Sequence, residues 1–402
     1  MYLKPQGTYD IYKDETILYI EEILQLLMEK YNYKYIRTPL FENSNLFYEC
    51  VGMTTDIVNK ETYEFTDRGN SKITLRPEGT TGAVRCYIEN KLYKNLIKPV
   101  KVWYYGPMYR YEKPQSGRFR EFYQFGVEAF GVNNPALDAE IISIPVNLYK
   151  SLGLKGIKVR INSLGNEETR EKYKKVLIKY FEPYLDLLCD DCKKRFYQNP
   201  LRVLDCKVDH HKEFFKSAPK IYDYLTDESR NYFESVKKYL KILNIDYEVS
   251  PTVVRGLDYY TDTVFEVRAD IKNYKGNTVL CGGGRYNDLI KKLTGFSTPA
   301  VGFAMGIERL LTALSAENIK LKIHNELDVY IYGNGYDNSV KLCNKLRKQG
   351  FTVDFNYTNC DIKEINAKYI INYLNEDTVK IIVDKNILTM NENKVVEYLT
   401  EN

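Results

Sequence analysis

Apolar side chains recur with a helical period near the start of the chain. Within residues 15–31 they stand three or four positions apart, at Ile17, Ile20, Ile23, Leu24, Leu27 and Met28. This spacing places them on one face and predicts an amphipathic helix. Two further helices are predicted over residues 138–152 and 302–315, where the second follows a proline and carries glycines on one face.

Short runs rich in β-branched and aromatic residues predict strands between these helices. They lie at residues 34–38, 73–75, 100–105, 122–129, 158–162, 251–255, 263–268 and 278–281. Residues 166–247 instead carry a Lys-, Tyr- and Leu-rich helical pattern with few strand signals. We interpret them as a helical insertion that divides one mainly antiparallel domain into residues 1–165 and 248–320.

A small second domain is predicted over residues 326–402, beyond a boundary near residues 319–325. Strand, helix, strand and strand patterns follow one another there, at 328–332, 339–349, 352–355 and 379–383. This order predicts an α/β module. Its net charge is −3, although four basic residues gather on its helix: Lys341, Lys345, Arg347 and Lys348.

Composition is that of a soluble globular protein. Hydrophobic residues make up 44% and charged residues 28% of the 402 residues, and no apolar run is long enough for a transmembrane helix or a signal peptide. Eight cysteines without a signal peptide predict reduced thiols in the cytoplasm. A net charge of +4 is too small to indicate nucleic-acid binding by itself.

Several common catalytic motifs are missing. The sequence has neither a Walker-type phosphate loop nor a G-x-G-x-x-G after a strand, and its three histidines are His210, His211 and His324. Catalysis by a Ser-His-Asp triad or an H-E-x-x-H zinc site is therefore nearly excluded. Any catalysis must use Arg, Glu, Gln and Tyr, which favours electrostatic stabilisation of phosphates.

The first candidate cluster is Arg76-Pro77-Glu78-Gly79-Thr80-Thr81, at the end of a short strand. A glutamate beside a Gly-Thr turn can hold a ligand ammonium group with its carboxylate and a hydroxyl. A plain turn with a capping threonine is the alternative, and this fragment alone favours it.

The second cluster, residues 106–128, has the pattern strand, basic loop, strand. Its loop contains Arg110, Lys113, Arg118 and Arg120 against Glu112, and arginine pairs bind phosphate oxygens bidentately. In the second strand Gln124, Gly126 and Glu128 are spaced by two. They therefore face one side and can form the floor of a small polar site, although a solvated hairpin is the alternative.

Three more clusters follow: Arg255-Gly256-Leu257-Asp258-Tyr259-Tyr260, then Gly282-Gly283-Gly284-Arg285-Tyr286, and residues 301–310 with Arg309. Successive glycines let a backbone approach a ligand closely. On the helix predicted over residues 302–315, Gly302, Gly306 and Arg309 would share a face, from which the arginine can reach a phosphate.

These five clusters, in this order, resemble the bacterial-type histidyl-tRNA synthetases, a family of class II aminoacyl-tRNA synthetases. The resemblance covers residues 1–325 and includes Pro5-Gln6-Gly7-Thr8-Tyr9-Asp10. Residues 37–42 (Arg-Thr-Pro-Leu-Phe-Glu) resemble motif 1, which in the family lies at a dimer interface. Residues 106–128 and 301–310 resemble motifs 2 and 3, while 255–260 and 283–286 resemble two signatures of the histidine enzymes.

The resemblance implies an α+β fold, with a class II antiparallel sheet flanked by helices, a helical insertion and a small C-terminal α/β domain. It implies ATP-dependent ligation of L-histidine to tRNA(His) through a histidyl-adenylate, with ATP and Mg²⁺ as cofactors. The expected protein is a cytoplasmic homodimer that does not bind membranes. The C-terminal domain, which binds the anticodon in the family, looks shortened between Cys360 and Val379.

The resemblance also implies roles for individual residues. Histidine would be bound by Glu78, Gly79, Thr80, Arg110, Gln124, Glu128, Arg255, Tyr259 and Tyr260. ATP would be bound by Arg110, Glu112, Arg118 and Arg309. Arg255 would be catalytic, because it would stabilise charge on the α-phosphate during attack by the histidine carboxylate. Gln115 and Arg120 would contact the tRNA acceptor end.

Two alternatives remain open in the sequence. The spacing Cys189-x2-Cys192-x13-Cys206-x3-His210 is like that of a structural zinc site, but we expect thiols without a metal, because the resemblance implies none. The non-catalytic regulatory subunit of ATP phosphoribosyltransferase also resembles these synthetases. The adenylation residues and the C-terminal domain, which such regulators lack, favour the synthetase.

Overall fold

The computed structural model describes most of the chain in two compact units, Met1–Leu321 and Lys322–Asn402. The described residues are 2–12, 15–53, 55–115, 117–206, 208–254, 256–271, 279–321, 327–333, 336–357, 365–383 and 386–401. Arg255, predicted to be catalytic, and His324 lie outside them.

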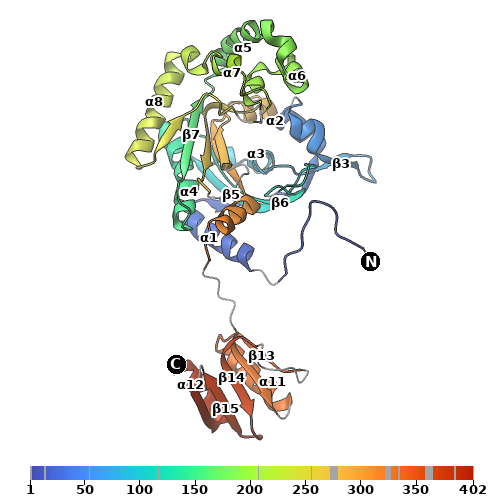
Figure 1. Cartoon of the computed structure of the whole chain (residues 1–402), viewed down its shortest axis with the longest axis vertical. Helices are drawn as coiled ribbons and strands as arrows, with labels where there is room; N and C mark the ends of the chain where they lie inside the picture. Colours follow the sequence, from blue (N-terminus) through green and yellow to red (C-terminus); the bar gives the residue numbers. More distant parts are fainter. Residues whose placement is uncertain are drawn as a thin grey trace. The chain divides into compact units, whose positions relative to one another are not determined.

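An eight-stranded sheet forms the centre of the first unit (Figure 1). Its strands, in spatial order, are β1 (Lys34–Tyr35), β5 (Val100–Tyr109), β6 (Glu121–Phe130), β11 (Ala300–Gly306), β10 (Val279–Arg285), β9 (Thr261–Arg268), β7 (Lys158–Ser163) and β8 (Tyr247–Val249). The outermost pairs, β1 with β5 and β7 with β8, are parallel, and the pairs between them are antiparallel. The predicted antiparallel class II sheet is confirmed.

The two faces of this sheet bury separate cores. On β5, Trp103 and Tyr105 belong to one core while Val102 and Tyr104 belong to the other, because side chains alternate along a strand. The first core also contains residues from helices α1 (Thr16–Lys30), α4 (Pro135–Ser151), α8 (Asp227–Ile242) and α10 (Ile307–Ala316). The second contains residues from α2 (Ser44–Val51), α3 (Thr80–Glu89), α9 (Leu289–Thr294) and the insertion.

Helix α1 confirms the first predicted helix. Ile17, Ile20, Leu24 and Met28 are its buried residues, and Ile23 and Leu27 pack beside them. Helix α4 starts three residues before its predicted start, because the Asn134 side chain accepts a hydrogen bond from the Ala136 backbone and Pro135 fits the first turn.

The residues predicted as an insertion form a group of helices between β7 and β8. These are α5 (Glu167–Phe181), η3 (Glu182–Leu187), α6 (Asp190–Gln198), η4 (Pro200–Asp205), α7 (Glu213–Lys216), η5 (Ile221–Tyr224) and α8. Figure 1 shows α5, α6 and α7 in green at one end of the first unit. The group contacts the rest of the unit through Asp56, whose carboxylate lies 3.0 Å from the Arg195 guanidinium, and through Asp258, which accepts from Asn199 at 2.9 Å.

A small three-stranded sheet lies beside α2 and α3. It contains β2 (Phe41–Asn43), β4 (Lys72–Leu75) and β3 (Tyr63–Thr66), in the order β2-β4-β3. Two short helices, η1 (Ile57–Glu61) and η2 (Leu92–Lys94), complete the described helices of the first unit.

Three predicted elements differ from the structure. The helix predicted over residues 302–315 is wrong in its first part, since residues up to Gly306 form strand β11 and the helix begins at Ile307. This strand is covered on both faces, so its nearly continuous apolar run has no alternation to distinguish it from a helix.

Residues 251–254, predicted as a strand, form a turn in which the Val253 amide donates to the Ser250 carbonyl at 3.1 Å. The strand predicted over 34–38 is shortened to β1.

The second unit is an α/β domain, as predicted. Its sheet has the order β13 (Val353–Phe355), β12 (Leu327–Gly333), β14 (Ala367–Tyr373), β15 (Thr378–Val383) and β16 (Asn386–Asn391). It also contains α11 (Tyr336–Lys348), η7 (Glu392–Lys394) and α12 (Val395–Glu401). Strands β14 and β16 and helix α12 were not predicted, and residues 358–364, in the stretch that looks shortened, are not described.

A buried ion pair joins β10 to α4. The Arg285 and Asp138 side chains have no exposed surface, and their closest N···O distance is 2.6 Å. Arg285 also donates to the carbonyls of Val132 at 3.1 Å and Asn134 at 3.3 Å. Arg285, part of a sequence signature, therefore has a structural role here.

We predict that Asp138→Ala destabilises the first unit by about 3–5 kcal/mol, because it leaves a buried guanidinium without its partner. Urea unfolding followed by the fluorescence of Trp103, the one tryptophan of the chain, measures this unit. Glu89→Ala is the control, since it breaks an exposed pair with Arg85 that contributes less than about 1 kcal/mol. Equal effects of the two variants would contradict the account.

Candidate functional site

The predicted site residues meet in one cavity of about 250 Å³ on the large sheet. Those that line it are Glu78, Thr80, Arg110, Glu112, Arg118, Gln124, Glu128, Tyr259, Tyr260 and Arg309. They come from β6, from the loop between β5 and β6, and from segments as far apart as α3 and α10. Gly79, Gln115 and Arg120 are not in the lining, and Arg255 lies outside the described residues.

Glu128 forms the floor of this cavity and is fully buried. Its carboxyl group receives hydrogen bonds from the hydroxyls of Thr80 at 2.8 Å and Tyr104 at 3.3 Å, and from the Tyr286 hydroxyl. Burial raises the pKa of Glu128 to about 8, although these hydrogen bonds oppose the shift.

Three glycines make room for this arrangement. A Cβ atom on Gly302, which pairs with Glu128 across β11 and β6, would lie 1.7 Å from the Glu128 Oε2. A Cβ on Gly79 or Gly126 would lie 2.0 or 2.1 Å from the Tyr104 ring. Gly79 therefore supports the site by admitting Tyr104, whose hydroxyl reaches Glu128, rather than by lining the cavity.

Acceptors for an ammonium group gather beside the floor. The Glu78 carboxylate accepts from the backbone amides of Thr80 at 2.9 Å and Thr81 at 2.8 Å, so it caps the start of α3 and is held in place. The alternative of a turn with a capping threonine is thus correct in part. A side chain does cap the helix, but it is that of Glu78, and the Thr80 hydroxyl donates to Glu128 instead. Gln124 adds a buried Oε1 that has no hydrogen-bond partner among the described residues.

Tyrosine rings form one wall of the cavity. The ring centroids of Tyr259 and Tyr260 are 4.6 Å apart, and those of Tyr259 and Tyr286 are 5.5 Å apart. All three side chains are buried. Flat aromatic walls of this kind suit a planar ligand ring.

The opposite end of the cavity is basic. Arg118 lies 3.0 Å and Arg110 lies 3.8 Å from the Glu112 carboxylate. Arg110 is also held by a 2.8 Å hydrogen bond to the Pro77 carbonyl, and Arg309 donates to the Val279 carbonyl at 3.2 Å. These contacts fix three guanidinium groups around one space, which suits a polyphosphate.

The N-terminal segment supports the basic loop. The Arg120 backbone amide donates to the Gly7 carbonyl at 2.7 Å, and its guanidinium lies 4.0 Å from the Tyr111 ring centroid. Tyr9 donates to Glu308 at 2.7 Å, and Glu308 also accepts from the Tyr123 amide at 2.7 Å. Arg120 therefore has a structural contact within the loop, whereas Gln115 is exposed at its end.

Two residues of the site escaped prediction as site residues. Tyr104 occurs in a hydrophobic strand, where nothing in the pattern separates it from a core tyrosine. Tyr286 is the last residue of Gly283-Gly284-Arg285-Tyr286, which resembles a signature of the histidine enzymes. Its position beside these glycines could have indicated that it belongs to the site.

Comparison with known proteins decides the family. A family model described as histidyl-tRNA synthetase matches residues 13–166 and 198–310. The chain belongs to the histidyl-tRNA synthetase family. Histidine–tRNA ligases of Geobacillus sp. (strain WCH70) and Staphylococcus haemolyticus are 47% and 46% identical to this family member, over 99% of the chain and 98% of each relative.

Solved structures agree with this family membership. The apo histidyl-tRNA synthetase of S. aureus has a TM-score of 0.84 and 41% identity, with 99% of this chain and 100% of that chain covered. An ATP phosphoribosyltransferase regulatory subunit/histidyl-tRNA synthetase from Bacillus halodurans has a TM-score of 0.62 and 22% identity, which shows a shared fold alone. Among the described residues of this synthetase-family chain, no helix is long and apolar enough to cross a membrane.

The raised pKa of Glu128 predicts a pH dependence of stability. Between the ordinary value of 4.5 and about 8 the folded state holds a proton that the unfolded state releases, so stability falls as pH rises through this range. Relative to Glu128→Gln, which cannot titrate, the wild-type free energy of unfolding should fall by up to about 1.4 kcal/mol per pH unit. Urea unfolding at several pH values measures it, and a constant difference would contradict the shift.

Proposed function

We propose that this cavity binds L-histidine and ATP, and that the chain uses them to ligate histidine to tRNA(His) through a histidyl-adenylate. The observation that carries the proposal is the cavity itself, where a buried carboxyl group, ammonium acceptors and three fixed guanidinium groups meet. Family membership and full-length similarity to histidine–tRNA ligases support the same reaction. The regulatory-subunit alternative has less support, because these guanidinium groups and the second unit are both present.

In this proposal the histidine side chain lies on Glu128, between the tyrosine rings. The Glu128 carboxyl can accept from one imidazole nitrogen, which an apolar isostere of histidine does not offer. The α-ammonium group lies at Glu78, Thr80 and Gln124, where the unpartnered Gln124 Oε1 supplies an acceptor. Binding would lower the pKa of Glu128, because a donor then faces its carboxylate.

The polyphosphate of ATP lies at the basic end. Arg110 contacts the α-phosphate, Arg118 the γ-phosphate, and Arg309 lies along the triphosphate. The histidine carboxylate attacks the α-phosphorus, the bond to the bridging oxygen breaks, and pyrophosphate leaves with that electron pair. Arg255 keeps its proposed catalytic role at the α-phosphate on the strength of the family resemblance, and Arg110 and Arg255 would also contact the histidine carboxylate.

Glu112 would hold Mg²⁺ at the basic end. This half-buried carboxylate stands between Arg110 and Arg118, where phosphate oxygens would complete an oxygen ligand set. An ion held there would supply positive charge for the leaving pyrophosphate.

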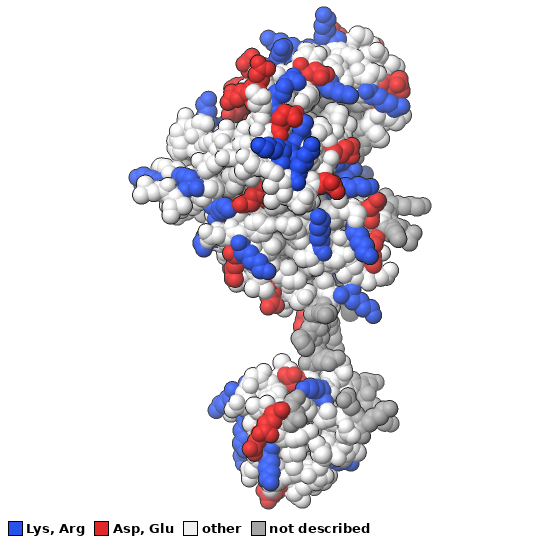
Figure 2. All heavy atoms as spheres, turned by 90° about the vertical axis from the view of Figure 1, so that its left-hand side faces the viewer, with Lys and Arg blue, Asp and Glu red and all other residues white. Residues whose placement is uncertain are grey.

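For the RNA, Gln115 on the exposed loop and Arg120 would contact the acceptor end, and the second unit would read the anticodon. The face drawn in Figure 2 has acidic and basic side chains interspersed on both units. Of the basic residues on α11, Lys345 pairs with Glu392 at 3.1 Å and Arg347 donates to the Val353 carbonyl at 2.7 Å. Anticodon reading would therefore depend on stacking and base edges more than on phosphate contacts.

The functional protein would be a homodimer in the cytoplasm. Two apolar side chains of the segment that resembles motif 1 are exposed, Leu40 at 38% and Phe41 at 55%, and nearby Tyr35 is 50% exposed. In a dimer with two-fold symmetry the same residues of both subunits would face each other, so these side chains would be buried on both subunits.

Histidine-dependent exchange of labelled pyrophosphate into ATP tests the proposal. The full chain should catalyse exchange with L-histidine and not with other amino acids. Absence of histidine-dependent exchange in folded protein would overturn the proposed function.

Glu128→Gln should weaken histidine binding by about 1.5–3 kcal/mol, since the charge-assisted bond to the imidazole is lost. ATP affinity, which depends on the other end of the cavity, should stay within a few-fold and is the internal control. Calorimetric titration of both ligands measures this. Unchanged histidine affinity would place the imidazole elsewhere.

Gln115→Ala should reduce charging of tRNA(His) and leave pyrophosphate exchange unchanged, because Gln115 is exposed and outside the cavity lining. In bacteria tRNA(His) carries an extra 5′ guanosine, which the family reads with this loop. Transcripts with and without that nucleotide separate the effects. Wild-type protein should discriminate strongly between them and the variant much less, whereas equal discrimination would remove Gln115 from this role.

A further inference from the structure

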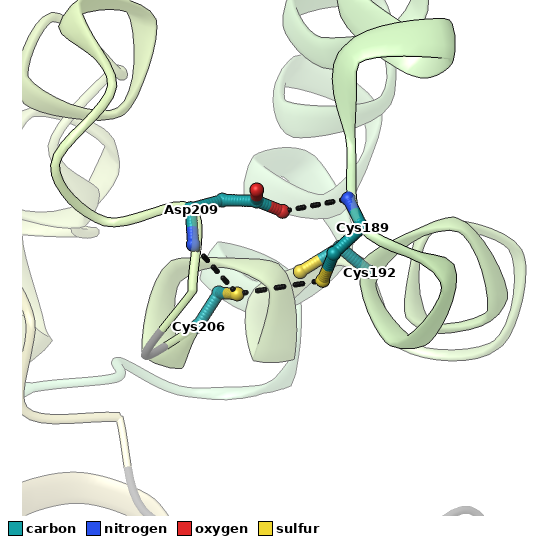
Figure 3. A group of neighbouring side chains, drawn as sticks. All are labelled: Cys189, Cys192, Cys206 and Asp209. Carbon is teal, nitrogen blue, oxygen red and sulfur yellow. Dashed lines mark hydrogen bonds between the residues drawn. The ribbon is translucent and has the colours of Figure 1, made fainter.

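Three cysteines of the insertion meet one buried aspartate, away from the cavity described above. Cys189, Cys192, Cys206 and Asp209 each offer one ligand atom, and these atoms all lie within 4.8 Å of one another (Figure 3). His210, the fourth residue of the spacing seen in the sequence, is exposed and is not part of the group. In the sequence these residues form two pairs of equal spacing, C-x2-C and C-x2-D.

We propose that these four residues bind a structural Zn²⁺ ion, although the sequence favoured thiols without a metal. Three thiolates and one carboxylate form a complete tetrahedral ligand set, with no position open for a substrate. The site would hold the helical insertion together rather than take part in the ligation chemistry.

The spacing of the sulfur atoms supports a shared ion. Two thiolates that bind one tetrahedral Zn²⁺ at about 2.3 Å each lie about 3.8 Å apart. The Cys189 and Cys206 sulfur atoms are 3.7 Å apart, whereas a disulfide requires about 2.0 Å. No two of the four ligand atoms lie more than 4.8 Å apart, so any excess over the tetrahedral spacing is at most about 1 Å, which small side-chain rotations can remove.

A backbone amide already donates to one of the sulfur atoms. The Asp209 amide donates to the Cys206 sulfur at 3.2 Å. Such outer contacts orient metal ligands and tune their basicity.

The aspartate is fixed and its charge is balanced. Asp209 is 1% exposed, and its Oδ2 accepts from the Cys189 amide at 2.8 Å while its Oδ1 lies 2.7 Å from the Lys212 ammonium. Each carboxylate oxygen keeps a second lone pair for a metal. Lys212 would offset part of the net negative charge of three thiolates and a carboxylate around a divalent ion.

The ion would fix two elements that reach the rest of the unit. Cys189 precedes α6 and Cys206 follows η4, and these elements carry Arg195 and Arg202, which lie 3.0 and 3.6 Å from the Asp56 carboxylate. Cys189 and Cys206 also line a cavity of about 400 Å³ that includes Arg110. Loss of the ion would therefore loosen the insertion beside the proposed ATP site.

Metal analysis of the full chain tests the proposal. Protein purified under reducing conditions should contain one zinc per chain, released when a mercurial blocks the thiols and a chromogenic chelator captures the metal. Replacement by Co²⁺ should give the intense visible bands of a tetrahedral ion and a thiolate-to-cobalt charge-transfer band. Protein that binds neither ion while its thiols react freely, or that contains a Cys189–Cys206 disulfide, would overturn the proposal.

Matched variants then assign the ligands. Cys206→Ser and Asp209→Ala should each weaken Zn²⁺ binding by more than about 10-fold, as judged by competition with a chelator. His210→Ala should bind as the wild type does. Loss of zinc in His210→Ala with retention in Asp209→Ala would overturn the ligand set, and the wild-type cobalt spectrum remains decisive if a variant does not fold.

Discussion

The candidate site depends on one buried carboxyl group, that of Glu128, whose hydrogen bonds must come from the protein instead of from water. Glu128 has no exposed surface, and three hydroxyls, from α3, β5 and the residue after β10, surround its oxygens. An unsatisfied carboxyl in such a place would cost several kcal/mol, so these segments are held in one arrangement. The same desolvation raises the pKa of Glu128 and so makes the group responsive to a ligand that donates a hydrogen bond.

The rest of the site is arranged around that group. Glycines at positions 79, 126 and 302 provide space that any side chain would fill, so the close approach of Tyr104 to Glu128 depends on them. Glu78 caps α3 and thereby fixes Thr80, which reaches the same carboxyl. At the basic end, Glu112 holds Arg118 and Arg110 before any phosphate arrives, which reduces the reorganisation that binding requires.

Parts of the fold and of the candidate site could be predicted from the sequence, wherever side chains recur with the period of a helix or of a strand. Helix α1 follows from its helical period, and the shared face of Gln124 and Glu128 follows from alternation on β6. Strand β11 could not be separated from a helix, because burial on both faces removes the alternation. Tyr104 was missed because its hydroxyl gains a role only from its hydrogen bond to Glu128, which the sequence does not show. Near the three cysteines, the sequence spacing pointed to His210, but Asp209 is the buried residue that joins them and His210 is exposed.

The central claim is that the Glu128 carboxyl selects histidine through an imidazole nitrogen. Calorimetric titration of the full chain with L-histidine and with β-(2-thienyl)-L-alanine, a five-membered-ring analogue without ring nitrogens, tests it most directly. Loss of the hydrogen bond to the imidazole nitrogen, about 1.5–3 kcal/mol, should weaken binding of the analogue by about 10- to 100-fold. Equal affinity for the two ligands would contradict the account, because the ring would then be bound by its shape alone.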